Sequence, residues 1–119
     1  MKSLKGIREY IENNPVAFAT VINYNKPNVI WVAFVKVVSD NQVLITDNYM
    51  NQTINDIVQN PNVCLNVWGK NFVGYKLIGQ AQYFTNGQWK EFIGKMKENR
   101  GLSAKGAVLV EVSKIISSK

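Results

Sequence analysis

Residues 28–48, NVIWVAFVKVVSDNQVLITDN, carry the strongest signal for the fold. This stretch opens with a long, almost wholly apolar run at 28–38, continues through the polar turn Ser39-Asp40-Asn41 and closes with a second apolar run at 42–46. Two runs rich in β-branched residues around a short polar turn are typical of an antiparallel β-hairpin. The first run is apolar on both faces, which indicates burial on both, or one face on the core and the other on a partner or ligand.

On either side of this hairpin we expect four further strands, because apolar runs of strand length recur between turn residues. These strands are predicted at 16–23, 63–68, 72–84 and 107–116. The strand at 72–84 contains Gly74 and Gly79, which we interpret as bulge or bend points.

Three stretches carry helical periodicity and helix-ending signals. They are predicted at 3–14, capped by Ser3, at 52–59, ended by Asn60-Pro61-Asn62, and at 86–99, capped by Asn86. Six strands in meander order, interrupted by short helices, favour a closed or nearly closed antiparallel barrel, because closure removes exposed sheet edges. The apolar surface exceeds what one small barrel interior can bury, so we expect a two-fold homodimer.

Composition narrows the possible functions. The 119 residues are expected to form one domain, 1–119, and they contain one cysteine and no histidine. Histidine-dependent hydrolysis is therefore excluded, and we expect no metal site. Cys64 lies in an alternating apolar run and is interpreted as a small core residue rather than a nucleophile. We expect no membrane span and no signal peptide, and hence a cytoplasmic location.

The formal net charge of +6 favours an anionic partner, such as a nucleic acid, an acidic surface or a phosphorylated small molecule. The lysines are scattered along the chain, which argues against a dedicated nucleic-acid arm and is also the pattern of an ordinary solvated surface. Difficult chemistry would have to come from carboxylates, lysines or an organic cofactor.

The ordered set of segments VAFATV, NVIWVAFVKV, VLITDN, NYMNQTINDIVQNP, VCLNVW, GYKLIGQAQY and KGAVLVEV resembles a known family. The resemblance is to the FMN-binding split barrels related to pyridoxamine 5′-phosphate oxidase, and most closely to their small FMN-binding members. It extends from about Ile7 to Ile115. It implies a mainly β fold with short helices, a six-stranded antiparallel split β-barrel, and a homodimer that holds FMN between its subunits.

The same resemblance implies the cofactor-binding residues. The flavin ring would lie between two groups of residues. Val29, Ile30, Trp31 and Val32 on the second strand form one group, and Thr46, Asp47 and Asn48 at the end of the third strand form the other. The phosphate would be held by Lys36 and by Gln52 and Thr53 at the start of a helix, where free backbone N–H groups favour anions. Lys105 would approach the partner's flavin.

Each of these assignments has a plainer alternative. Trp31 could belong to the subunit interface, Gln52-Thr53 could be a simple helix cap, Lys36 could reach solvent at the barrel rim, and Lys105 could be an ordinary loop lysine. This chain departs from the family's pattern in two places: Gln52 stands where the family commonly has a cation, and Trp31 stands where the oxidases have an arginine.

Three functions remain open at this point. The first is an FMN-dependent oxidoreductase that receives electrons from NAD(P)H or a redox partner protein. The second is a flavin-binding electron carrier or storage module without turnover. The third is a small basic barrel that binds single-stranded nucleic acid through Trp31, Trp68, Tyr75, Tyr83 and the lysines. The sequence identifies neither the substrate nor the electron donor, and does not separate FMN from FAD or a deazaflavin.

Overall fold

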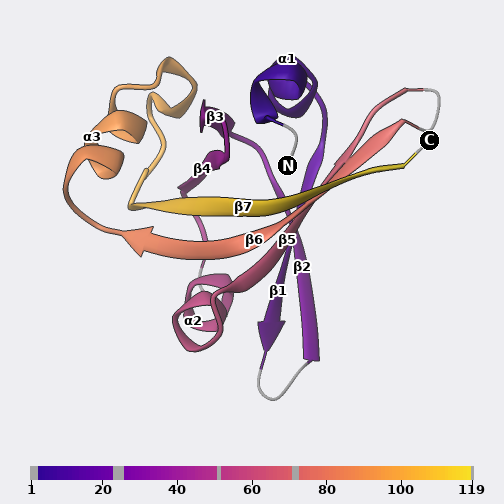
Figure 1. Ribbon diagram of the computed structural model, residues 1–119. Helices are drawn as coiled ribbons and strands as arrows, with labels where there is room; N and C mark the ends of the chain where they lie inside the picture. The colour runs from indigo at the N-terminus through magenta and orange to yellow at the C-terminus, as the bar shows by residue number, and fades with distance from the viewer. Residues whose placement is uncertain (1–2, 23–25, 51, 71–72, 119) are drawn as a thin grey trace.

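The computed structural model describes residues 3–22, 26–50, 52–70 and 73–118 (Figure 1). Within these ranges seven antiparallel strands form one sheet in the order β2-β1-β5-β6-β7-β4-β3. The strands are β1 (Val16–Ile22), β2 (Lys26–Val32), β3 (Val35–Ser39), β4 (Gln42–Asp47), β5 (Asn62–Trp68), β6 (Gly74–Phe84) and β7 (Gly106–Ser118). The mainly β, antiparallel architecture expected from the sequence is confirmed.

Short helices surround the sheet. They are the 3₁₀ turns η1 (Leu4–Ile7) and η3 (Lys97–Asn99) and the α-helices α1 (Arg8–Glu12), α2 (Gln52–Gln59) and α3 (Gln88–Gly94). Figure 1 shows α1 at the top of the molecule, α2 at the bottom and α3 at the left. Among the described helices, none combines the length and the apolar character that crossing a membrane requires.

The predicted single strand at 28–38 is wrong, and the strand count is seven rather than six. The strand is interrupted at Ala33 and Phe34, so that β2 pairs with β1 while β3 pairs with β4. The reason is topological: β1 and β4 are separated by three other strands in the sheet, and one straight strand cannot pair with both. Because only two residues join the edge strands β2 and β3, the sheet must curl until its edges approach each other.

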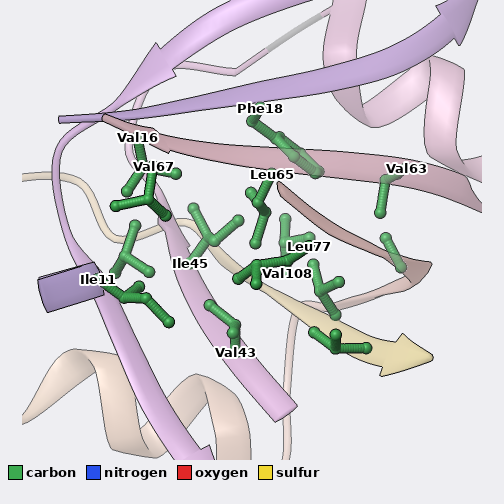
Figure 2. Close-up of a cluster of buried hydrophobic side chains, with 14 of the residues drawn as sticks. Ile11, Val16, Phe18, Val43, Ile45, Val63, Leu65, Val67, Leu77 and Val108 are labelled. Carbon is green, nitrogen blue, oxygen red and sulfur yellow. The ribbon is translucent and has the colours of Figure 1, made fainter. Parts of the chain in front are cut away.

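The barrel interior holds the main hydrophobic core. Alternate side chains of each strand point inward, as the two-residue period of a strand requires. On β5 these are Val63, Leu65 and Val67, all buried. Figure 2 shows them packed against residues from the other strands and from α1: Ile11, Val16, Phe18, Val43, Ile45, Leu77 and Val108.

The N-terminal helical region differs from the prediction of one helix at 3–14. It is a 3₁₀ turn followed by the five-residue α1. Ser3 caps it as expected, since its hydroxyl accepts a hydrogen bond from the backbone N–H of Lys5 at 3.1 Å. Glu12 then accepts a hydrogen bond from the backbone N–H of Val37 at 2.8 Å. This carboxylate satisfies a backbone donor of the edge strand β3.

The third predicted helix is shorter than 86–99, and Asn86 does not cap it. Gly87 is the capping residue, with φ +86°, and α3 ends at Gly94. The buried side chain of Asn99 explains the early end, because its amide donates to the carbonyl of Ile93 at 2.9 Å. Trp89, Ile93 and Met96 pack against a second core on the outer face of β4 and β7, whereas Phe92 of the same helix is exposed.

Glycines at two positions on β6 behave differently. The register of β6 and β7 shifts between Ile78 and Gly79, so the predicted bulge at Gly79 is confirmed. A side chain at Gly79 would overlap the backbone of Glu111. Gly74 was expected to be a bulge or bend point; it begins β6 and pairs with Trp68 on β5 and Ser118 on β7 without a register shift, so the structure shows no bulge there.

Candidate functional site

A cleft of about 400 Å³ opens where β2 passes into β3. It lies at the break in the barrel, between β2, the loop after β4 and the start of α2. Its volume falls in the range of small-molecule sites, roughly 300–1,000 Å³. The cleft is lined by Asn28, Ile30, Trp31, Val32, Ala33, Phe34, Thr46, Asn48, Tyr49, Met50, Gln52, Thr53 and Leu102.

One wall of the cleft is apolar and comes from β2 and the residues after it. Ile30 and Val32 are partly buried and contact the main core. The side chain of Trp31 points to the opposite face of the strand and is 72% exposed, so it lies at the mouth of the cleft. A flat, mostly apolar ligand could lie against this wall.

The end of the cleft at α2 is polar. The amide of Asn28 donates to the hydroxyl of Thr20 at 3.2 Å and to that of Thr53 at 3.3 Å. Thr20 in turn donates to Asp56 at 2.9 Å, and the amide of Gln52 donates to the other oxygen of Asp56 at 2.8 Å. Thr20, Thr53 and Asp56 are all buried, so this network joins β1, β2 and α2 into one unit.

The first turn of α2 therefore faces the cleft. Gln52 and Thr53 both line it, and the first backbone N–H groups of an α-helix lack acceptors within the helix. These groups and the helix dipole favour a ligand atom that carries negative charge or a lone pair.

The loop after β4 is held by Asp47, which is fully buried. Its carboxylate accepts hydrogen bonds from the backbone N–H of Met50 at 2.7 Å and from the hydroxyl of Tyr83 at 2.5 Å. Burial, and then the hydrogen bond to Asp47, raise the pKa of Tyr83 well above its ordinary value. The ammonium of Lys105 lies 3.9 Å from the same carboxylate and donates to the carbonyl of Met50 at 2.6 Å.

The buried amide of Asn99 supports the loop from the other side. Asn99 donates to the hydroxyl of Thr46 at 3.0 Å, and Asn48 donates to the carbonyl oxygen of the Asn99 side chain at 3.5 Å. Asn48 also accepts a hydrogen bond from the backbone N–H of Ala104 at 2.6 Å. Ala104 has φ +40°, a backbone region that L-residues rarely adopt, and this hydrogen bond helps to hold it there.

Comparison with known proteins identifies the family. Residues 4–118 match the sequence profile described as pyridoxamine 5′-phosphate oxidase. The chain belongs to this family. An uncharacterized protein from Methanocaldococcus jannaschii is 31% identical over 113 residues, which cover 92% of this chain and 76% of that protein.

Two solved structures show the same fold at low sequence identity. HupZ from Group A Streptococcus superposes with a TM-score of 0.84 at 22% identity, covering 95% of this chain and 91% of that one. An FMN-binding protein from Syntrophomonas wolfei superposes with a TM-score of 0.81 at 13% identity, covering 98% of this chain and 86% of that one. The split barrel of the pyridoxamine 5′-phosphate oxidase family is thus the fold of this chain.

The structure brings most of the sequence-predicted site residues together. Those that line the cleft are Ile30, Trp31, Val32, Thr46, Asn48, Gln52 and Thr53. Asp47 is adjacent but points into the loop behind the cleft, where it holds Met50 and Tyr83. Lys105 lies behind the same loop.

Besides Asp47 and Lys105, two more predicted residues lie outside the cleft lining. Lys36 forms an ion pair of 2.9 Å with Glu98, and the hydrogen bond from Lys36 lowers the pKa of that carboxyl group. Val29 lies on the outer face of β2 and is 61% exposed. Neither side chain is among those that form the cleft.

Sequence reasoning missed six lining residues: Asn28, Ala33, Phe34, Tyr49, Met50 and Leu102. Tyr49 and Met50 directly follow the predicted Asp47 and Asn48, so extending that segment would have found them. Ala33 and Phe34 were hidden by the assumption of a continuous strand. Leu102 comes from the loop before β7, and no local signal connects it with the cleft.

Proposed function

We propose that this member of the pyridoxamine 5′-phosphate oxidase family is a flavin-dependent redox protein that binds FMN in the cleft. The observation that carries the proposal is the cleft itself, with an apolar wall on one side and hydrogen-bonding groups on the other. The fold shared with the FMN-binding protein from Syntrophomonas wolfei supports it.

The lining residues suit the parts of FMN to different degrees. Ile30, Val32 and Phe34 offer apolar contact to a flat ring, and Thr46 and Asn48 would hold its polar edge. The ribityl phosphate would extend toward the first turn of α2, where the backbone N–H groups and Thr53 can donate hydrogen bonds. The group fits, with neutral donors at its phosphate end.

Bound flavin supplies electron and hydride transfer, which the amino-acid side chains of this chain cannot perform. The task of the chain is to position the ring and set its surroundings. Asn48 would present a side-chain amide whose orientation is fixed by the Asn99 and Ala104 contacts. Ile30 and Val32 would exclude water from one side of the ring.

We further propose that the working unit is a homodimer. The outer face of β1, β2 and β5 carries Val29 and Trp31 with Ala17 and Ala19 directly opposite them in the neighbouring strand. Cys64, which faces Ala19 from β5, is half-buried, and burial raises the pKa of its thiol. A second copy covering this apolar face would also border the cleft, because Trp31 belongs to both.

Whether the protein turns over with NAD(P)H or only carries electrons to a partner is a matter of kinetics. Both versions use the same cleft and the same chain residues. Steady-state reduction by NADH or NADPH separates them.

The nucleic-acid alternative receives little support. Of its four proposed stacking residues, Tyr83 is held by Asp47 and Tyr75 packs edge-on against Tyr10, with ring centroids 5.4 Å apart. Three of the lysines that could contact nucleic-acid phosphates are paired with carboxylates. These ion pairs are Lys5–Asp40, Lys36–Glu98 and Lys105–Asp47. Only Trp31 and Trp68 of the proposed set are exposed aromatic rings.

The test is an FMN titration of the wild type and two tryptophan variants, with flavin fluorescence as the readout. Ala33→Trp adds a ring at the exposed break in the cleft, whereas Thr85→Trp adds the same ring on an exposed loop outside it. We expect Ala33→Trp to weaken FMN binding by at least about tenfold and Thr85→Trp to leave it unchanged. Failure of the folded wild type to bind FMN would refute the proposal, and equal binding by all three proteins would place FMN elsewhere.

A further inference from the structure

The end of the cleft at α2 carries no charged side chain among the lining residues that the structure describes. Its neutral donors are also largely committed to internal partners. The two hydrogens of the Asn28 amide are directed at Thr20 and Thr53, and the amide of Gln52 is directed at Asp56. A phosphate dianion entering here would meet backbone N–H groups and one hydroxyl, with no cation among the described residues that line the cleft.

A buried carboxylate lies directly behind these donors. Asp56 is 3% exposed and contacts Thr20 and Gln52 within 2.9 Å. No ion pair between described residues includes it. Its formal negative charge opposes the attraction that the start of α2 would exert on an anion, because like charges at short range in a buried setting repel strongly.

We infer that the cleft recognises the flavin ring and the neutral hydroxyls of the ribityl chain of the flavin, and does not select for the terminal phosphate. The inference rests on the proposed flavin function and specifies its ligand class: riboflavin binds about as well as FMN. The network of Asn28, Thr20, Thr53, Gln52 and Asp56 sets this specificity. Gln52 and Asp56 are the residues through which it can be changed.

The first measurement is the ratio of the dissociation constants of riboflavin and FMN, in 0.1 M salt and in about 1 M salt. At the higher salt the Debye length falls to about 3 Å, so general attraction by the net positive charge is screened. A ratio below about tenfold at high salt supports the inference, and a larger preference for FMN overturns it while leaving the flavin function intact. If neither flavin binds, the proposed function fails, and the inference fails with it.

The second measurement changes the charge behind the cleft. Asp56→Asn is expected to shift the ratio toward FMN by at least about threefold, since it removes the opposing charge. Asp40→Asn is the matched control, because it removes an exposed carboxylate from the turn between β3 and β4 and should leave the ratio unchanged.

Asp56 is buried, so a variant that adds charge at an exposed position is also needed. Gln52 is exposed, and Gln52→Lys adds a cation that meets either the phosphate or Asp56. We expect it to shift the ratio toward FMN by about tenfold. If the folded Gln52→Lys variant keeps the ratio of the wild type, charge at this end does not govern recognition and the inference is overturned.

Discussion

The hydroxyl of Tyr83 donates a 2.5 Å hydrogen bond to the carboxylate of Asp47. This contact joins the middle of the sheet, at β6, to the end of β4, where the loop bearing Asn48, Tyr49 and Met50 begins. The same carboxylate holds the backbone of Met50 at 2.7 Å. The shape of one side of the cleft therefore depends on a carboxylate that does not line it.

Removing the Tyr83 hydroxyl tests this dependence. Tyr83→Phe should lower the free energy of unfolding by about 1–3 kcal/mol, because a buried carboxylate loses a hydrogen-bond donor. Tyr49→Phe is the matched control, since Tyr49 is 75% exposed. Chemical denaturation measures both. Equal stability of the two variants would show that the Tyr83 contact contributes nothing to the fold.

The raised pKa of Tyr83 predicts how stability changes in alkali. An unfolded tyrosine ionises near pH 10, and the folded protein holds this proton more tightly. The folded state then binds more protons than the unfolded state above about pH 10, so stability falls as the pH rises through this region. Above about pH 10 the wild type should lose stability more steeply with rising pH than Tyr83→Phe, as measured by urea denaturation. Parallel curves would contradict the assignment.

Gly106 lies against the ring of Tyr83, and a Cβ atom there would overlap the ring. Gly106→Ala should cost about 1–3 kcal/mol of stability by overpacking. Gly94→Ala is the control, because nothing lies within 4 Å of the added atom at the end of α3. This control should be neutral or slightly stabilising. Thermal unfolding that ranks the two variants in the opposite order would rule out the steric explanation.

The proposed dimer predicts a difference between two exposed valines. Val29 lies on the apolar outer face of β2 and Val58 lies on α2, at 61% and 73% exposure. Val29→Glu should convert a dimer to a monomer, because it buries an unpaired charge at the interface, whereas Val58→Glu should remain dimeric. Light scattering after gel filtration measures both masses. A wild type that is monomeric at all concentrations would contradict the proposed dimer.

Local signals predicted α2 well and the second strand poorly. The helix at 52–59 was expected with the bounds that the structure has, because Pro61 disfavours a helical conformation at Asn60 and so ends the helix. The break at Ala33 carries no glycine, proline or polar residue. It follows from which strands pair, and pairing is decided by the whole sheet rather than by the local sequence.

The same distinction separates the found from the missed parts of the site. Ile30, Val32 and Thr46 lie within residues 28–48 and Thr53 follows shortly after, so the resemblance could carry them over. Asn99 supports the cleft through buried hydrogen bonds that only the folded chain creates. The resemblance implied that Lys36 binds the phosphate, and the structure instead pairs it with Glu98.

Backbone amide chemical shifts during an FMN titration measure where bound flavin lies. We expect the largest shifts at 30–34, at 46–50 and at Leu102, all around the cleft. A separate open hollow beside α1, lined in part by Arg8, Tyr10 and Tyr75, serves as an internal control and should not respond. Shifts that gather at this hollow, or no shifts at saturating FMN, would contradict the assignment of the cleft as the flavin site.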